Sequence, residues 1–176
     1  ARLRLSGTLP AAIGGLTALA SLDMGTTPLS GSLPTTLLQH LPGLVTLDLS
    51  NCQPSGQPLA TTLNFPQLRT LTLHENRFTG SIDPSLPLIA PNLTTVTLHN
   101  QRGSGFAGNL PAEIATLTRL STFTGSGNSF SGRLPDFPAS IETLVLADNA
   151  LEGTIPTEYA QLPSLSTINL RTNRLT

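Results

Sequence analysis

The sequence contains little charge, few aromatic residues and a single cysteine. Of its 176 residues, 11% are charged and 4% are aromatic, and the formal net charge is −1. Nucleic-acid recognition needs clustered Lys and Arg, but the nine basic residues are scattered along the chain, so we expect no nucleic-acid partner. Cys52 has no second cysteine with which to form an internal disulfide. No apolar run approaches the ~18 residues that a membrane span requires.

A Gly-x-Leu/Ile-Pro tetrapeptide, complete in five copies and degenerate in two, recurs along the whole chain. The copies begin at Gly7, Gly31, Gly56, Gly80, Gly108, Gly132 and Gly153. These glycines are 24, 25, 24, 28, 24 and 21 residues apart, and such a near-constant period marks a repeat protein. The repeat predicts a solenoid, in which each unit buries its apolar side chains against its neighbours.

Each unit has a central pair of apolar residues separated by one residue. The pair is Leu47 and Leu49 in the second unit, and Leu71 and Leu73 in the third. This alternation is the period of a β-strand with one buried face. A three-residue strand cannot bury its leucines alone, but strands stacked about 4.8 Å apart share one core. We therefore predict one short strand per unit, stacked in a single row.

The full repeat reads Leu-x-x-Leu-x-Leu-x-x-Asn-x-Leu-x-Gly-x-Leu-Pro and resembles the plant-type class of the leucine-rich-repeat family over the entire chain. The resemblance implies an α/β repeat solenoid, a right-handed superhelix with a short-stranded parallel sheet on its concave face. The convex arcs are too short and too rich in glycine for long helices, so we expect loops and single 3₁₀ turns there. We expect residues 1–176 to form one solenoid of about seven repeats of roughly 24 residues.

Two features bear on the setting of the chain. It starts and stops inside a repeat without the cysteine-paired caps usual in extracellular members of the class, so we expect part of a longer protein. Its open coil ends are expected to pack on flanking repeats or subunits. Asn92 begins an acceptor sequence for N-glycosylation, which together with the plant-type pattern favours an extracellular or cell-surface location.

Several columns of residues are explained by the fold alone. The Asn position of the repeat, which includes Cys52 and Asn76, is expected to bond the backbone of the adjacent coil. Cys52 is expected to be a small buried group rather than a reactive thiol, because nothing basic near it would stabilise a thiolate. The aromatic residues that replace Leu in the turn segment are expected to stack as a core spine. They are Phe78, Phe106 and Phe130.

The residues on either side of the buried strand position point to solvent and form three columns on the concave wall. We predict that a partner contacts this wall, because it presents neutral donors and acceptors at regular spacing on a rigid scaffold. The predicted contact residues are Asp23, Asp48, Thr70, Thr72, His74, Thr95, Thr97, His99, Thr122 and Thr124. The 28-residue repeat carries extra residues at 101–105, which are expected to form a loop that adds Arg102 to the contacts.

Two side-chain pairs in these columns suggest a metal site and a catalytic pair of carboxylates. We expect neither pair to have that role. His74 and His99 occupy the same column in successive coils, but two imidazoles alone make a weak metal site and Glu75 is expected on the rim. Asp23 and Asp48 also stack, but carboxylates on an open sheet are too poorly desolvated for acid–base catalysis. We therefore predict a protein with no enzymatic activity, no cofactor and no metal.

The sequence favours a recognition scaffold that binds a protein, peptide or glycan partner, a role implied by the resemblance to plant receptor ectodomains and polygalacturonase inhibitors. One alternative is an ice-binding solenoid, since Thr-x-Thr recurs in three consecutive units as on the faces of antifreeze solenoids. The simpler explanation of those residues is the high strand propensity of Thr. A second alternative is an architectural subunit of a larger fibre or complex.

Overall fold

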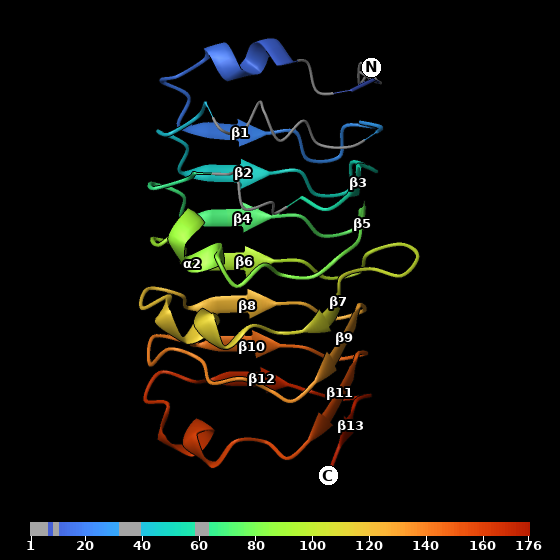
Figure 1. Ribbon diagram of the computed structural model, residues 1–176, viewed down its shortest axis with the longest axis vertical. Coiled ribbons are helices and arrows are strands. Elements are labelled where there is room, and N and C mark those ends of the chain that lie inside the picture. The colour runs from blue at the N-terminus through green and yellow to red at the C-terminus, as the bar shows by residue number, and fades with distance from the viewer. Residues whose placement is uncertain (1–6, 9–10, 32–39, 59–63) are drawn as a thin grey trace.

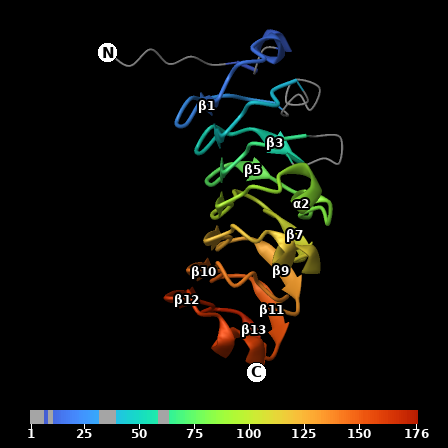
Figure 2. The same ribbon diagram turned by 90° about the vertical axis from the view of Figure 1, so that its left-hand side faces the viewer.

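The computed structural model describes residues 7–8, 11–31, 40–58 and 64–176. The chain winds into coils that stack along one axis, so that the blue N-terminal and red C-terminal coils lie at opposite ends (Figure 1). Each coil contributes one strand to a sheet that runs along the stack. Seen from the side, the stack is gently curved, with this sheet on its inner side (Figure 2).

The long sheet has seven strands in the order β1-β2-β4-β6-β8-β10-β12, and every pairing in it is parallel. The strands are β1 (Ser21–Asp23), β2 (Thr46–Asp48), β4 (Thr70–Thr72), β6 (Thr95–Thr97), β8 (Thr122–Thr124), β10 (Thr143–Val145) and β12 (Thr167–Asn169). From β1 to β10 the middle residue of each strand is buried, as the alternation requires. The predicted solenoid of stacked parallel strands is confirmed.

A second group of strands lies on the next side of each coil, and the sequence interpretation did not predict it. The strands are β3 (Ser55–Gly56), β5 (Arg77–Phe78), β7 (Ala107–Asn109), β9 (Ser129–Gly132), β11 (Ala150–Gly153) and β13 (Arg174–Leu175). β3 pairs with β5, and the other four form a parallel sheet. The pairing residues precede Pro135 and Pro156, so the missing proline N–H leaves these strands intact.

The outer arcs contain single helical turns, as predicted. They are the 3₁₀ turns η1 (Ala11–Gly15), η2 (Ala112–Thr116) and η3 (Thr157–Gln161) and the four-residue helix α2 (Leu86–Ile89). Pro111 and Pro156 directly precede η2 and η3, where the missing N–H of proline costs no hydrogen bond. No helix in the described parts of the chain has the length and apolar character needed to traverse a bilayer.

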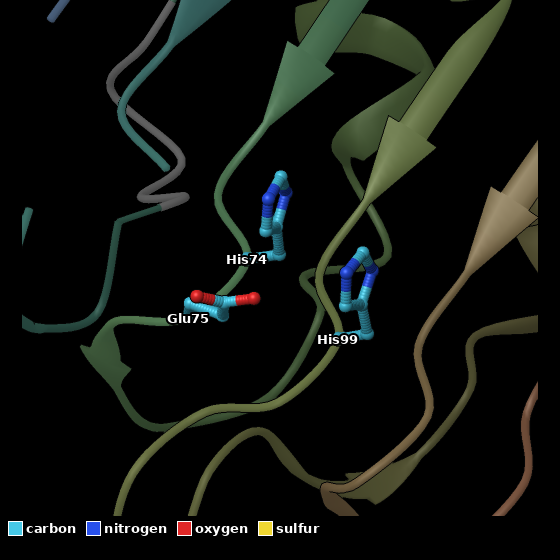
Figure 3. A group of neighbouring side chains, drawn as sticks. All are labelled: His74, Glu75 and His99. Atoms are coloured by element: carbon cyan, nitrogen blue, oxygen red, sulfur yellow. The ribbon is translucent and has the colours of Figure 1, made fainter. Parts of the chain in front are cut away.

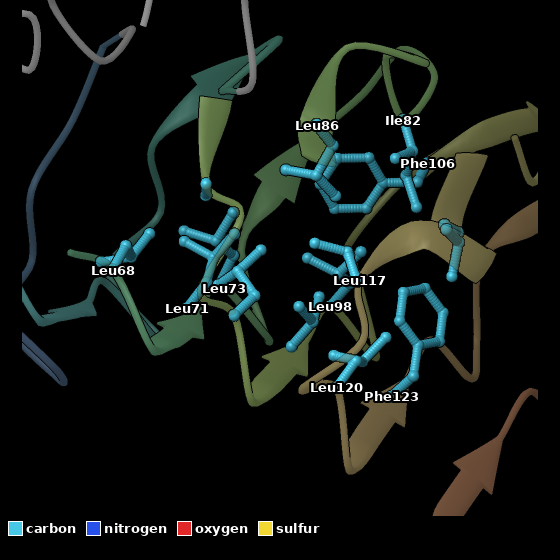
Figure 4. Packing of buried hydrophobic residues seen from close by; sticks show 14 of the residues in the cluster. Leu68, Leu71, Leu73, Ile82, Leu86, Leu98, Phe106, Leu117, Leu120 and Phe123 are labelled. Atoms are coloured by element: carbon cyan, nitrogen blue, oxygen red, sulfur yellow. The ribbon is translucent and has the colours of Figure 1, made fainter. Parts of the chain in front are cut away.

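A continuous apolar core fills the space between the long sheet and the outer arcs (Figure 4). Phe106 is fully buried, and its ring centroid lies 6.4 Å from that of Phe78 and 6.3 Å from that of Phe130. These rings form the predicted spine, and burying each of them contributes about 1.5–3 kcal/mol. In the 28-residue repeat, Arg102, Gly103 and Ser104 are exposed, outside this core.

Amide side chains bond the backbone of the neighbouring coil, as predicted for the Asn position of the repeat. Asn76 Oδ1 accepts from the N–H groups of Cys52 and Gln53, both at 2.9 Å. Asn76 Nδ2 donates to the carbonyls of Leu49 at 2.7 Å and Leu73 at 2.9 Å. Equivalent bonds to an adjacent coil are made by Gln101, Asn128, Asn149 and Asn173. These amides satisfy buried backbone groups where the chain leaves the long sheet.

Candidate functional site

The concave face of the long sheet holds the predicted contact residues in aligned columns. The aligned threonines are Thr70, Thr95 and Thr122 in the first column and Thr72, Thr97 and Thr124 in the second. All of them are half-buried, on either side of a buried middle residue. Because adjacent strands lie about 4.8 Å apart, the hydroxyls repeat at that spacing on a rigid backbone. The sequence therefore predicted the positions of these columns correctly.

The residue that follows the column of His74 and His99 turns the chain away from the sheet. In all seven coils this residue has a left-handed backbone, with φ between 50° and 64°. The residues are Thr26, Asn51, Glu75, Asn100, Gly127, Asp148 and Thr172. Asn, Asp and Gly favour this conformation, so their recurrence here was a sequence signal for the turn that we did not use. Strand alternation does not extend past this residue.

His74 and His99 lie in adjacent coils with their rings stacked, the centroids 4.4 Å apart and the planes inclined by 10°. His99 Nδ1 lies 3.2 Å from Thr124 Oγ1 of the next coil. His74 and Thr97 hold the equivalent places one coil earlier. His74 Nδ1 and Thr97 Oγ1, however, are both buried without a hydrogen-bond partner. His99 is thus anchored through Nδ1, whereas His74 is not.

The surroundings of His99 lower its pKa below the ordinary value of 6.5. Burial is the largest cause, because it disfavours the charged imidazolium. A charge on His74 acts in the same direction, and the carboxylate of Glu75 opposes both. His99 is therefore neutral at pH 7, with a ring nitrogen lone pair available to a hydrogen-bond donor or a metal ion.

Glu75 lies beside the histidine pair, so the prediction that placed it on the rim is wrong. One ligand atom from each of His74, Glu75 and His99 lies within 4.8 Å of the other two (Figure 3). In the described ranges this is the only such group of three or more His, Cys, Asp or Glu side chains. The reason is the left-handed backbone of Glu75, with φ of 57°, which breaks the alternation of side-chain directions at the end of the strand.

Asp23 and Asp48 occupy the N-terminal end of the concave face, as predicted. Each accepts a hydrogen bond from the backbone N–H two residues later, at 2.9 Å for Asp23 and 2.8 Å for Asp48. Such bonds close turns, which gives both carboxylates a local structural role. At the other end of the face, Arg171 and Asp148 form an exposed ion pair of 3.5 Å, which contributes little to stability.

Arg102 and Asn92 lie away from these columns. The loop at 101–105 projects from the coil edge between β6 and β7, as expected, and Arg102 is exposed on it (Figure 1). The backbone N–H of Arg102 donates to the carbonyl of Asn76 at 2.7 Å, which fixes the start of the loop. Asn92 is half-buried, and its Nδ2 donates to the carbonyl of Pro66 at 2.7 Å. Its glycosylation stays a prediction.

The sequence matches known repeat and receptor proteins. The family model described as Leucine Rich Repeat matches residues 67–88. Receptor-like protein 41 of Arabidopsis thaliana is 32% identical over 129 residues, which cover 68% of this chain and 14% of that protein. The chain thus spans a small part of the length of the curated relatives that it matches.

Solved plant proteins have the same fold. The Arabidopsis receptor kinase HAESA, in complex with the peptide hormone IDA and the co-receptor SERK1, matches with a TM-score of 0.88 and 28% identity over 97% of this chain and 28% of that one. A plant ice-binding protein matches with a TM-score of 0.78 and 26% identity, over 97% of this chain and 54% of that one. Together with the parallel strands stacked in the long sheet and the amide column, these similarities identify the chain as a leucine-rich-repeat solenoid similar to the ectodomains of plant receptors.

Proposed function

We propose that this solenoid is a non-enzymatic recognition scaffold that binds a protein or peptide along its concave face, outside the cell. The observation that carries the proposal is the row of in-register polar columns on the seven-stranded sheet. The peptide hormone and co-receptor in the HAESA complex support a partner of this class. The receptor-like relatives support a location at the cell surface.

The concave face suits an extended polar partner. Its threonines are short and stiff at χ1, and each strand of the long sheet from β2 to β10 is held by a neighbour on both sides, so little conformational entropy is lost on binding. Hydroxyls along the sheet, apart from the buried one of Thr97, can hydrogen-bond the N–H and C=O groups of an extended chain. Because the face is nearly neutral, specificity would come from hydrogen-bond matching, with Asp23 and Asp48 favouring a basic group at their end.

The exposure of the concave face to solvent argues against catalysis. Acid–base and nucleophilic catalysis depend on groups enclosed away from bulk water, where their charges interact strongly. Asp23 is exposed and Asp48 is half-buried, and both are already engaged in local turns. We therefore assign these carboxylates to partner contact and turn formation rather than to a reaction.

Selection of a displayed random-peptide library on the folded, immobilised chain tests the proposal. We expect enrichment of a small number of motifs whose binding depends on the concave face. Thr72→Lys places a long charged side chain in the middle of that face and should weaken the selected peptides about tenfold or more. Thr157→Lys makes the same change on the exposed convex turn η3 and is the matched control, which should bind unchanged. Absence of an enriched motif, or equal loss in the two variants, would overturn the proposal.

Ice binding is a second candidate, favoured by the threonine columns and by the match to a plant ice-binding protein. Aligned hydroxyls at strand spacing form a regular array. Three observations weaken it: the threonines of the second column give way to Val145, the hydroxyl of Thr97 is buried, and the sheet is curved (Figure 2). Recognition of a peptide or protein is therefore better supported.

Thermal hysteresis separates the two candidates with the same pair of variants. If the face binds ice, the wild-type chain and Thr157→Lys produce hysteresis and Thr72→Lys does not. If the wild-type chain at millimolar concentration produces none, ice binding is eliminated and the recognition proposal is unaffected.

A further inference from the structure

One cluster on the concave face has a chemistry that peptide recognition does not require. We propose that His74, Glu75 and His99 form a binding site for a divalent transition-metal ion of the zinc type. Two imidazole nitrogens and one carboxylate oxygen are a ligand set that Zn²⁺ commonly uses in proteins. The proposal concerns the ion alone, so it holds or fails independently of the partner that the concave face binds.

The backbone holds the three residues at fixed places. His74 and His99 each follow a strand of the long sheet by two residues, and those strands, β4 and β6, pair in register. The N–H of Glu75 donates to the carbonyl of His99 at 3.0 Å, which ties the carboxylate-bearing residue directly to the second histidine. The carbonyl of His74 accepts from the N–H of Asn51 at 2.9 Å. The cluster is therefore built on ordered backbone rather than on a free loop.

The three ligand atoms are close to metal-binding distance but need to contract. They lie within 4.8 Å of one another, whereas ligand atoms around a tetrahedral ion with bonds of about 2.1 Å lie about 3.4 Å apart. A movement of roughly 1 Å in side chains closes that difference. Figure 3 shows the two rings side by side with Glu75 next to them.

Binding requires one ring to turn, because stacked rings direct their in-plane lone pairs alongside each other and not at one point. His74 is the ring that can turn, since its Nδ1 has no hydrogen-bond partner to break. His99 stays in place through its Nδ1 contact with Thr124 Oγ1, and metal binding selects the tautomer in which Nδ1 donates to that oxygen and Nε2 carries the lone pair for the ion. Metal-bound histidines usually have such an outer hydrogen bond on the nitrogen that does not bind the metal.

The ligand set selects the ion. Mg²⁺ and Ca²⁺ prefer oxygen ligands alone, so they should bind poorly here. Imidazole with carboxylate suits Zn²⁺, and also Co²⁺, Ni²⁺ and Cu²⁺. Three protein ligands leave one position of a tetrahedral ion open toward the concave side of the sheet.

Isothermal titration of the metal-stripped chain with ZnCl₂ tests the site, with MgCl₂ as the ion that should give no binding. We expect one Zn²⁺ per chain, and a visible Co²⁺ absorption band typical of tetrahedral coordination. His74→Gln, His99→Gln and Glu75→Gln should each weaken Zn²⁺ binding about tenfold or more, because each removes one of three ligands. His40→Gln and Glu152→Gln are the matched controls and should bind like the wild type.

Thr124→Val tests the outer hydrogen bond without touching a ligand, and should weaken binding up to about tenfold. Circular dichroism of every variant verifies that the solenoid is folded before its affinity is compared. The proposal is overturned if the wild-type chain does not bind Zn²⁺ at one site, if His40→Gln weakens binding as much as His74→Gln, or if Glu75→Gln binds as tightly as the wild type.

Discussion

Asn76 and Cys52 occupy the same column in successive coils and are both fully buried, yet they serve the backbone differently. Asn76 accepts from two N–H groups and donates to backbone carbonyls. The Sγ of Cys52 lies 2.9 Å from the carbonyl of Met24 and 3.1 Å from that of Ser50, and its single proton can serve only one of them. The expected buried, structural thiol is confirmed, but it satisfies less of the backbone than an amide does.

The larger difference between the amide and the thiol is that only the amide has a strong hydrogen-bond acceptor. Asn149 Oδ1 accepts the N–H of Phe130 from the preceding coil at 3.0 Å. A thiol offers no comparable acceptor, and in the coil before Cys52 the N–H of Leu29 bonds the carbonyl of Thr27 at 2.6 Å, within its own coil. An amide in this column therefore joins two coils through both a donor and an acceptor, whereas the thiol reaches the preceding coil only as a donor to the carbonyl of Met24. Cohesion along the stack should vary with the residue in this column.

Replacing Asn76 by Ala should produce the largest loss of stability. It leaves buried N–H and C=O groups without partners, at about 1–3 kcal/mol for each, so we expect the free energy of unfolding to fall by about 3 kcal/mol or more. Cys52→Ala removes a weak donor and a small volume and should cost about 1 kcal/mol. Urea denaturation followed by circular dichroism measures both changes.

Thr157→Ala on the exposed convex turn is the control for this pair and should change stability by less than about 0.5 kcal/mol. Equal losses for the Asn76 and Cys52 variants would contradict the comparison, because the amide would then contribute only its volume.

Gln101 extends the comparison to an amide that is one methylene longer. Its Oε1 accepts the N–H of Phe78 at 3.1 Å, and its Nε2 donates to the carbonyls of Leu73 at 2.8 Å and Leu98 at 2.9 Å. Asn128 makes the equivalent three bonds with a shorter side chain, so the informative change is Gln101→Ala, which removes all three bonds and should cost about 2 kcal/mol. Hydrogen exchange should become faster at the Phe78 N–H in particular, and unchanged protection there would contradict the argument.

Cys52→Asn replaces the thiol in this column by an amide like those of the other coils. The two side chains have similar volumes, and the amide offers two donors to the carbonyls of Met24 and Ser50, where the thiol has one. We expect the free energy of unfolding to rise by about 1 kcal/mol in urea denaturation. A loss of stability would show that the turn at Leu29 is fixed by its own coil and cannot use the new acceptor.

Much of this architecture could be predicted from the sequence because it depends on short-range patterns. Leu71 is buried between Thr70 and Thr72, which are half-buried, as strand alternation requires. Phe78 and Phe106 pack against each other because the same place in two repeats must face the same core. Repetition turns one local pattern into a long-range contact, so the columns followed directly from the alignment of the repeats.

Two features could not be predicted in this way. Glu75 lies just past the point where alternation ends, and its direction depends on a left-handed backbone that its residue type alone does not indicate. The second sheet pairs short segments such as Ser129–Gly132 and Ala150–Gly153, which contain glycine and few β-branched residues. Those segments are extended because the solenoid stacks them, and local propensity does not reveal them.

The smallest expected effect is a pH dependence that distinguishes the thiol from the amide. Burial is the main cause that raises the pKa of Cys52 above its ordinary value of 9.0. Below that value the thiol is protonated in both the folded and the unfolded chain and contributes no pH dependence. As the pH rises through 9.0, the unfolded chain loses its proton first, so the folded state loses stability.

At pH 9.5 the loss should be below about 1 kcal/mol relative to pH 8. The pKa of Tyr159 is also raised by burial, and its phenol donates to the carbonyl of Pro135, so it adds a loss of its own at higher pH. That loss is common to the wild type and Cys52→Asn and cancels when their urea midpoints are subtracted. The stability difference between the two proteins should therefore widen from pH 8 to pH 9.5, because only the wild type carries the thiol. A constant difference over this range would mean that the folded-state thiol ionises as readily as the unfolded one.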